Sequence, residues 1–371
     1  MREYLLVFLV AAVVSYLLCV VARELAMRLG AVAQVRDRDV HAVPIPYFGG
    51  VAMLGGLGAG LLIAHQLPFL SLSQPQIFHD AGVVLTGGAI ICAVGVLDDL
   101  IELDALTKLG GQVLAAGYLV LNGVQLYSLR VPGRDQIVLD STQAVLFSIV
   151  LIVGTVNAIN FVDGLDGLAS GMVCIGAFAF FLFSYRLADA NNETLAITAA
   201  LLCACLAGAC VGFLPHNFYP ARIFMGDSGS MLLGLVLSGA TLSLTGQFAG
   251  LQLNGGTETL GTTLVILLPI LLPLAILVVP FVDLVLAVVR RTRRGQMFYQ
   301  PDKEHLHHRL LEFGHSQRKA VVIMWLWAGL IGFGAVLVSL YTGPATVVVV
   351  AVWAAATAIL TFVVPRLRSP V

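Results

Sequence analysis

Long apolar segments recur along this sequence and constrain its fold more strongly than any other feature. A helix that crosses a bilayer needs about 20 mostly apolar residues. Soluble domains carry about 25% charged residues, whereas this chain of 371 residues carries only 11%. The sequence therefore predicts an all-α fold, a polytopic transmembrane helical bundle that forms a single integral membrane domain over residues 1–371. Eleven segments are long enough to span, at 4–27, 47–66, 79–97, 109–127, 143–159, 168–186, 194–214, 228–247, 260–289, 319–341 and 344–364.

The apolar segments also decide how the N-terminal run and the cysteines are interpreted. Leu5–Val21 is longer than the apolar core of a typical signal peptide and precedes no clear small-residue cleavage site. We therefore expect it to be the first transmembrane helix, and we expect no soluble domain before or after the bundle. All six cysteines fall inside apolar segments without zinc-site spacing, which predicts buried thiols rather than disulfides.

Positive charges are distributed unevenly between the two sides of the predicted bundle. With the N-terminus outside, sixteen of the twenty Lys and Arg residues lie toward the inner side, at or beyond the inner ends of the segments. Eight of them lie in the loop between the ninth and tenth segments. Because cytoplasmic loops carry an excess of Lys and Arg, the sequence predicts an N-terminus outside and a cytoplasmic C-terminus.

Most side chains suited to catalysis or ligand binding lie in these same cytoplasmic loops. A transporter more often places ionisable residues at mid-membrane depth, within an inverted repeat, and we find no convincing repeat. Clustering at one membrane boundary instead favours an enzyme with one aqueous substrate and one lipid substrate. The candidate catalytic loops span residues 28–46, 98–108, 160–167, 215–227 and 290–318.

The first two loops carry candidate phosphate and metal groups. Arg38 and His41 can contact a phosphate, and an ordinary basic juxtamembrane loop is the alternative. Adjacent carboxylates repel one another unless a cation lies nearby, so Asp98 and Asp99 indicate a magnesium or general-base site, with a solvated helix cap as the alternative. Lys108 can neutralise phosphate charge.

The third and fourth loops combine amides, carboxylates and glycines. In NAINFVDGLDGLASG, the residues Asn157, Asn160 and Asp163 share a face if the spacing is helical. Such polar density between two apolar helices is costly to bury without ligands. In FMGDSGS, Asp227 stands at the start of a predicted helix, where it can hold magnesium or act as a plain N-cap.

The fifth loop, RRTRRGQMFYQPDKEHLHHRL, gathers histidines among many cations. A zinc ion prefers fewer cationic neighbours and usually a carboxylate or thiolate ligand. Neutralisation of a nucleotide diphosphate explains these surroundings better. Contact with anionic lipid is the alternative, and it accounts for the arginines but not for His305, His307 and His308.

Four motifs follow one another along the chain: LDD at 97–99, NAINFVDGLDGLASG at 157–171, FMGDSGS at 224–230 and HLHHRL at 305–310. Together they resemble the polyprenyl-phosphate N-acetylhexosamine-1-phosphate transferase family, over nearly the whole chain. The resemblance implies transfer of a sugar 1-phosphate from a UDP-sugar to a polyprenyl phosphate, with release of UMP and with Mg²⁺, or alternatively Mn²⁺, as cofactor. It also implies a multi-pass protein of the bacterial plasma (inner) membrane with a cytoplasmic active site, a homodimer, and no nucleic-acid partner.

The resemblance implies roles for the residues nearest the chemistry. Asp98 resembles the base or orienting residue for the lipid phosphate. Asp99 resembles its catalytic partner, close to the metal or to Lys108. Asp227 resembles the main metal ligand, and Asn160 resembles the second one.

The resemblance also bears on the substrate contacts. The family often has a lysine where this chain has Asp39, and Arg38 is expected to supply that charge. Asp163 is expected to be catalytic and to contact the nucleotide or sugar. The remaining expected substrate contacts are Arg38, His41, Asn157, Asp166, Asn217, His305, His307 and His308.

The histidine motif bears on which sugar is transferred. HLHHRL resembles the branch of the family that uses UDP-GlcNAc to start cell-envelope polysaccharides, whereas the branch that uses UDP-MurNAc-pentapeptide typically has three consecutive histidines. GlcNAc 1-phosphate transfer is therefore expected, with another UDP-N-acetylhexosamine or UDP-MurNAc-pentapeptide as the alternative. A CDP-alcohol phosphotransferase is disfavoured, because DGLDGLASG lacks the arginine and the later acids of that signature.

Overall fold

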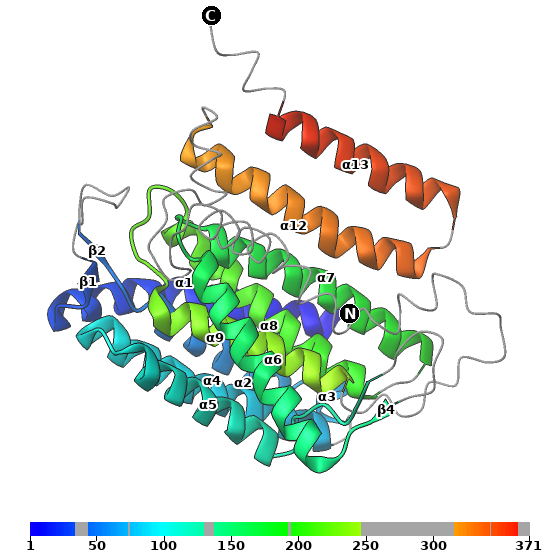
Figure 1. Ribbon diagram of the computed structural model, residues 1–371, viewed down its shortest axis with the longest axis horizontal. Helices are drawn as coiled ribbons and strands as arrows, with labels where there is room; N and C mark the ends of the chain where they lie inside the picture. The colour runs from blue at the N-terminus through cyan, green and yellow to red at the C-terminus, as the bar shows by residue number, and fades with distance from the viewer. Residues whose placement is uncertain are drawn as a thin grey trace, which may run out of the picture.

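The computed structural model describes residues 1–33, 44–72, 75–129, 137–191, 194–245, 315–341 and 343–362. In this part of the chain eight helices are long and apolar enough to cross a membrane, which confirms an all-α, multi-pass membrane protein (Figure 1). All six cysteines are buried and free, as predicted. The eight helices are α1 (Arg2–Leu29), α4 (Pro75–Ile101), α6 (Ser141–Val162), α7 (Leu168–Asn191), α8 (Thr194–Asn217), α9 (Gly226–Thr245), α12 (Gln317–Leu340) and α13 (Pro344–Phe362).

Shorter helices account for two of the predicted segments. Helices α2 (Gly49–Ala64) and α5 (Ala105–Leu121) match the predicted segments 47–66 and 109–127, but with 16 and 17 residues they are shorter than a typical span. A one-turn helix, α3 (Pro68–Ser71), follows α2. Eleven spans and the sides of the two termini therefore stay predictions.

Some predicted features lie outside the described residues. The ninth predicted segment, 260–289, is one of them, and so is most of the fifth catalytic loop, 290–318. Their arrangement stays a prediction. The same holds for five predicted site residues, which are Arg38, His41, His305, His307 and His308.

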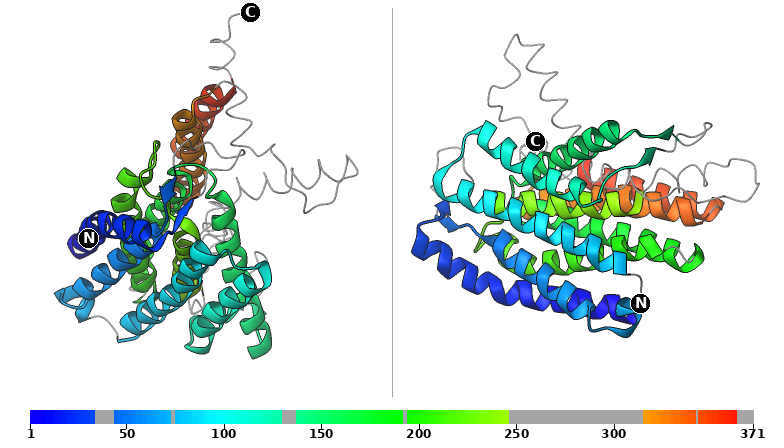
Figure 2. Two further views of the ribbon diagram at one scale, coloured as in Figure 1. Left: turned by 90° about the vertical axis from the view of Figure 1, so that its left-hand side faces the viewer. Right: turned by 90° about the horizontal axis from the view of Figure 1, so that it is seen from below.

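Helix α9 is the most deeply buried of the eight long helices. It packs against α4, α6 and α8, and all its residues from Ser228 to Thr245 are buried. Three of its hydroxyl groups need no water, because Ser238, Thr241 and Thr245 donate to carbonyl oxygens one turn earlier at 2.7–3.0 Å. By contrast, α13 exposes most of its surface, and the pair α12–α13 lies at one edge of the bundle (Figures 1 and 2).

Two short antiparallel hairpins, which apolar periodicity did not predict, lie at opposite ends of the bundle (Figure 1). Strands β1 (Val32–Ala33) and β2 (Ile45–Pro46) connect the end of α1 to the start of α2. Strands β3 (Ser128–Leu129) and β4 (Ile137–Val138) connect α5 to α6. The first hairpin marks the end of the bundle at which the candidate catalytic residues meet.

Contacts at that end hold the segment before α9 in place. Helix α2 starts without a side-chain cap, and its first N–H groups instead donate to this segment. Gly49 N donates to Phe224 O at 3.0 Å, and Gly50 N donates to Met225 O at 3.2 Å. These bonds satisfy donors that a helix start leaves unpaired. They also join the connection after α1 to the connection after α8.

The opposite end of the bundle has its own contacts. The Glu3 carboxylate accepts hydrogen bonds from Phe69 N at 2.8 Å and Leu70 N at 2.9 Å, so the start of α1 is tied to α3. Arg186 of α7 donates to the hydroxyl of Tyr341, which follows α12. The connections after α1, α4, α6 and α8 therefore lie at one end, which is the alternation that the sequence predicts.

Candidate active site

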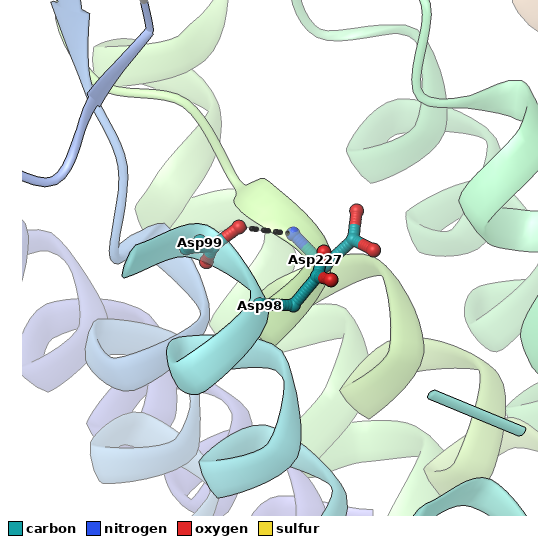
Figure 3. A group of neighbouring side chains, drawn as sticks. All are labelled: Asp98, Asp99 and Asp227. Carbon is teal, nitrogen blue, oxygen red and sulfur yellow. Dashed lines mark hydrogen bonds between the residues drawn. The ribbon is translucent and has the colours of Figure 1, made fainter. Parts of the chain in front are cut away.

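Three carboxylates lie together where the end of α4 meets the start of α9 (Figure 3). Asp98 and Asp99 stand in the last turn of α4, and Asp227 stands in the first turn of α9. One oxygen of each lies within 4.8 Å of the others. The predicted loop 98–108 is thus largely two helix ends, because α5 already begins at Ala105. Helices hold side chains in a more fixed geometry than a loop does.

Lys108 joins two of these carboxylates. Its ammonium nitrogen lies 2.8 Å from Asp98 Oδ2 and forms a second ion pair with Asp227. Asp104 starts α5 as an N-cap that accepts from two backbone N–H groups at 3.0 Å each. Hydrogen bonds from the Thr107 hydroxyl and backbone lower the pKa of Asp104. The cap fixes the first turn of α5, from which Lys108 reaches α4 and α9.

Asn160, near the end of α6, binds the other oxygen of Asp227. Its amide nitrogen donates to Asp227 Oδ1 at 2.8 Å and to Ser230 Oγ at 2.9 Å. An ionised carboxylate can only accept hydrogen bonds, so the amide group is oriented with its carbonyl oxygen turned away from Asp227. Lys108 engages one oxygen of Asp227 and Asn160 engages the other.

Asp99 caps the N-terminus of α9. Its Oδ1 accepts from the backbone N–H of Asp227 at 2.8 Å (Figure 3). Its Oδ2 accepts from the backbone N–H of Ser228 at 3.3 Å. Gly226 permits this approach, because its φ is 68° and a Cβ there would overlap the Asp99 carboxylate. Asp99 therefore orients Asp227 through the helix backbone. Its expected place beside a metal stays a prediction.

Asp163 lies directly after α6 and is partly exposed. Burial by the surrounding protein raises the pKa of Asp163 to about 8, with contributions from the negative charges of Asp227, Asp99 and Asp166. This shift favours the protonated form of the carboxyl near neutral pH. In that state it can donate a hydrogen bond to a phosphate or sugar oxygen.

Two predicted substrate contacts tie the turn after α6 to the segment after α8. Asn217 is 2% exposed; its Oδ1 accepts from Gly167 N at 3.0 Å, and its amide nitrogen donates to Ile223 O at 3.1 Å. Asp166, also 2% exposed, accepts from Ala221 N at 2.9 Å. Through these bonds both residues hold the turn after α6 against the segment after α8. Their direct contact with nucleotide or sugar stays a prediction.

The cluster offers the kind of ligands that magnesium prefers. Mg²⁺ binds oxygen, usually through one or two carboxylates together with substrate phosphates, and Mn²⁺ accepts similar ligands. The cluster holds three carboxylates and one ammonium group, which pairs with Asp98 and Asp227, so the surplus of carboxylates favours a further cation. The residues present therefore fit a divalent cation, and Asp227 and Asn160, the two predicted ligands, are in contact.

Apolar side chains are exposed next to this charged cluster. Leu97 and Ile101 flank the two aspartates of α4 and are 51% and 67% exposed, and Leu106 on α5 is 80% exposed. In a membrane protein, large exposed apolar residues of this kind mark surface that contacts lipid. The charged cluster therefore borders an apolar surface that suits contact with lipid.

Sequence reasoning missed two residues at this site. Ser230 accepts a hydrogen bond from Asn160, and its place in FMGDSGS was a signal that could have found it. Gln112 exchanges hydrogen bonds with Asn157, which was expected to contact substrate. A lone amide in an apolar helix is costly unless it is paired, and this cost was the available signal for Gln112.

Known proteins similar to this chain share one type of reaction in their names. The model of glycosyl transferase family 4 matches residues 81–245. A decaprenyl-phosphate N-acetylglucosaminephosphotransferase of Mycobacterium tuberculosis is 45% identical over 99% of this chain and 90% of its own length. The protein of that name from Mycobacterium leprae is 46% identical over 90% of this chain and 83% of its own length. A phospho-N-acetylmuramoyl-pentapeptide-transferase of Mycobacterium bovis is 31% identical over 88% of this chain and 94% of its own length.

Proposed function

This chain belongs to glycosyl transferase family 4, and from that premise we propose that it transfers N-acetylglucosamine 1-phosphate from UDP-N-acetylglucosamine to a polyprenyl phosphate and releases UMP. The names of its relatives support the sugar. Those named for N-acetylglucosamine phosphate transfer to decaprenyl phosphate are 45–46% identical, whereas the muramoyl-pentapeptide relative is 31% identical. The lipid product starts a cell-envelope polysaccharide.

The observation that carries this proposal is the position of Lys108. Its ammonium group pairs with Asp98 and Asp227 at a helix end bordered by exposed apolar residues. A reaction between two anionic substrates needs positive charge at the point where they meet. A lipid-anchored phosphate meets the protein at the membrane surface, next to this group.

Asp227 and Asn160 are proposed to hold magnesium. When bound, the ion neutralises charge on the diphosphate and polarises the phosphorus that is attacked. Asp99 keeps Asp227 oriented through its bonds to the start of α9. Lys108 adds a second positive charge for the diphosphate, because its flexible side chain can exchange a carboxylate partner for a phosphate oxygen.

Asp98 is proposed to orient the acceptor phosphate. Its Oδ1 accepts from Leu103 N at 3.0 Å, so Oδ2, on the side of Lys108, is the oxygen that can take a proton. An acceptor phosphate oxygen attacks the β-phosphorus of the UDP-sugar. A new P–O bond forms there, the bond to the bridging oxygen breaks, and UMP leaves with that oxygen. We infer direct attack without a covalent enzyme intermediate, since a phosphate oxygen is itself a competent nucleophile.

We infer that this site faces the cytoplasm at the bacterial plasma membrane. The excess of Lys and Arg on the same side as the catalytic loops supports that orientation. Arg38, His41 and the histidines of the fifth loop are proposed to contact the diphosphate and sugar from segments outside the described residues. Asn157, Asp163, Asp166 and Asn217 are proposed to complete the substrate contacts, and a homodimer stays an expectation.

The choice of sugar can be tested with the purified full-length protein and decaprenyl phosphate in detergent. UDP-GlcNAc, UDP-GalNAc and UDP-MurNAc-pentapeptide are supplied separately at equal concentration, and UMP release is measured. We expect rapid release with UDP-GlcNAc, little with its epimer and none with the pentapeptide donor. Turnover of UDP-MurNAc-pentapeptide alone would contradict the proposed sugar. If none of the three donors releases UMP, the proposed reaction is wrong.

A further inference from the structure

A second set of side chains lies one helical turn deeper in the bundle than the charged cluster. Gln112 on α5, Asn157 on α6 and Met231 on α9 make up this set. Each stands three or four residues from an active-site residue on the same helix, and residues at that spacing share a helix face. Gln112 shares a face of α5 with Lys108, Asn157 shares a face of α6 with Asn160, and Met231 shares a face of α9 with Asp227.

Gln112 contacts both other members of this set. The amide nitrogen of Asn157 donates to Gln112 Oε1 at 2.6 Å. In return, the Gln112 nitrogen donates to Asn157 Oδ1 at 3.3 Å and lies 3.5 Å from Met231 Sδ. The Asn157 nitrogen also donates to Val153 O at 2.8 Å, which fixes the orientation of its amide group. Helices α5, α6 and α9 thus meet at a single side chain.

The Gln112 side of the amide pair Gln112–Asn157 is closed to water, whereas Asn157 is exposed. Gln112 is 2% exposed and lies in a mostly apolar stretch of α5. An amide without a partner in such surroundings is unfavourable. The helices therefore prefer the spacing that keeps the Gln112 amide bonded to Asn157. One turn further along, the same spacing sets the distances between Lys108, Asn160 and Asp227.

We propose that Gln112 is a positioning residue, which acts through the amide pair to hold Lys108 and Asn160 at the correct distance from Asp227. It does so without touching substrate. The proposal rests on the metal-dependent site proposed above. Polar partners that orient metal ligands typically change metal affinity or activity by about 10–100-fold when they are removed.

The test uses the purified full-length chain with Gln112→Met, which keeps the length of the side chain and removes the amide. Mn²⁺ binding without any substrate is followed by the paramagnetic resonance signal of the free ion. We expect roughly tenfold weaker Mn²⁺ binding and a similar rise in the Mg²⁺ concentration for half-maximal turnover. The KM for the lipid acceptor should stay unchanged. Combining Gln112→Asn with Asn157→Gln keeps both amides and should restore most of the lost affinity.

A matched control removes a buried polar contact far from the cluster. Ser148 on α6 accepts from Leu126 N at 2.8 Å near the opposite end of the bundle, so Ser148→Ala should lower the melting temperature and leave Mn²⁺ binding unchanged. If Gln112→Met also lowers only the melting temperature, the positioning role is wrong. Should Gln112→Met fail to fold, Asn157→Ala at the more exposed partner must weaken Mn²⁺ binding in the same way.

The two proposals can fail separately. A wild-type protein that binds Mn²⁺ but releases no UMP from any donor would overturn the proposed function. In that case the effect of Gln112→Met on Mn²⁺ binding would still decide the positioning role.

Discussion

Replacing Asp227 with asparagine is expected to reduce turnover by about 10³-fold or more, equivalent to roughly 4 kcal/mol of transition-state stabilisation. Asparagine has the same shape but removes the charge that faces Lys108 and the proposed magnesium. The fold should persist, because Asp99 binds the backbone N–H of residue 227 rather than its side chain. Initial rates over a range of Mg²⁺ concentrations measure the effect.

A suitable control for this variant is Asp140→Asn. Asp140 caps α6 at the opposite end of the bundle, and asparagine caps a helix about as well as aspartate does. Its turnover and Mg²⁺ dependence should match those of the wild type. If Asp227→Asn behaves like this control at ordinary Mg²⁺ concentrations, Asp227 does not belong to the metal site.

Replacing Lys108 with methionine is expected to have two opposite effects. Turnover should fall by about 10²–10³-fold, since a charge that stabilises the diphosphate is lost. Metal binding without nucleotide should instead become about tenfold tighter. In the wild type the ammonium group pairs with Asp98 and Asp227 and repels an incoming cation, and the variant lacks that group. Free Mn²⁺, measured by paramagnetic resonance in the absence of substrate, reports the second effect independently of activity.

Lys319→Met provides the matched control, because Lys319 is an exposed residue of α12 and its replacement changes the net charge equally. That variant should bind Mn²⁺ as the wild type does. Unchanged or weaker Mn²⁺ binding by Lys108→Met would show that Lys108 does not compete with the metal. It would also remove the main electrostatic argument for a cation bound at Asp227 beside Lys108.

Much of the fold follows from the apolar segments alone. Their length predicts the helices, and their alternation places Asp98, Asp163, Asp166 and Asp227 at one end of the bundle. The structure confirms that alternation through contacts such as those between Asn160 and Asp227. Helix limits are harder to predict, because α4 continues through Asp98 and Asp99 although charged residues usually mark the end of a membrane segment.

Roles that depend on distant partners could not be predicted from one sequence. Lys108 and Asp227 are 119 residues apart in the chain, and no local pattern shows that they meet. The cap formed by Asp99 likewise depends on the tertiary position of α9. The amide pair between Gln112 and Asn157 is a third such case, since an isolated glutamine in an apolar helix gives no sign of its partner.

Labelling of the donor shows whether the enzyme transfers the sugar together with its phosphate. Full-length protein receives UDP-GlcNAc that carries ³²P only at the β-phosphate, with decaprenyl phosphate and Mg²⁺, and products are separated into lipid and aqueous fractions. We expect the label to move into the lipid fraction, unlabelled UMP to appear in equal amount, and chelation of the metal to stop both. Label that stays in the aqueous fraction as UDP, while the sugar alone reaches the lipid, would contradict this expectation.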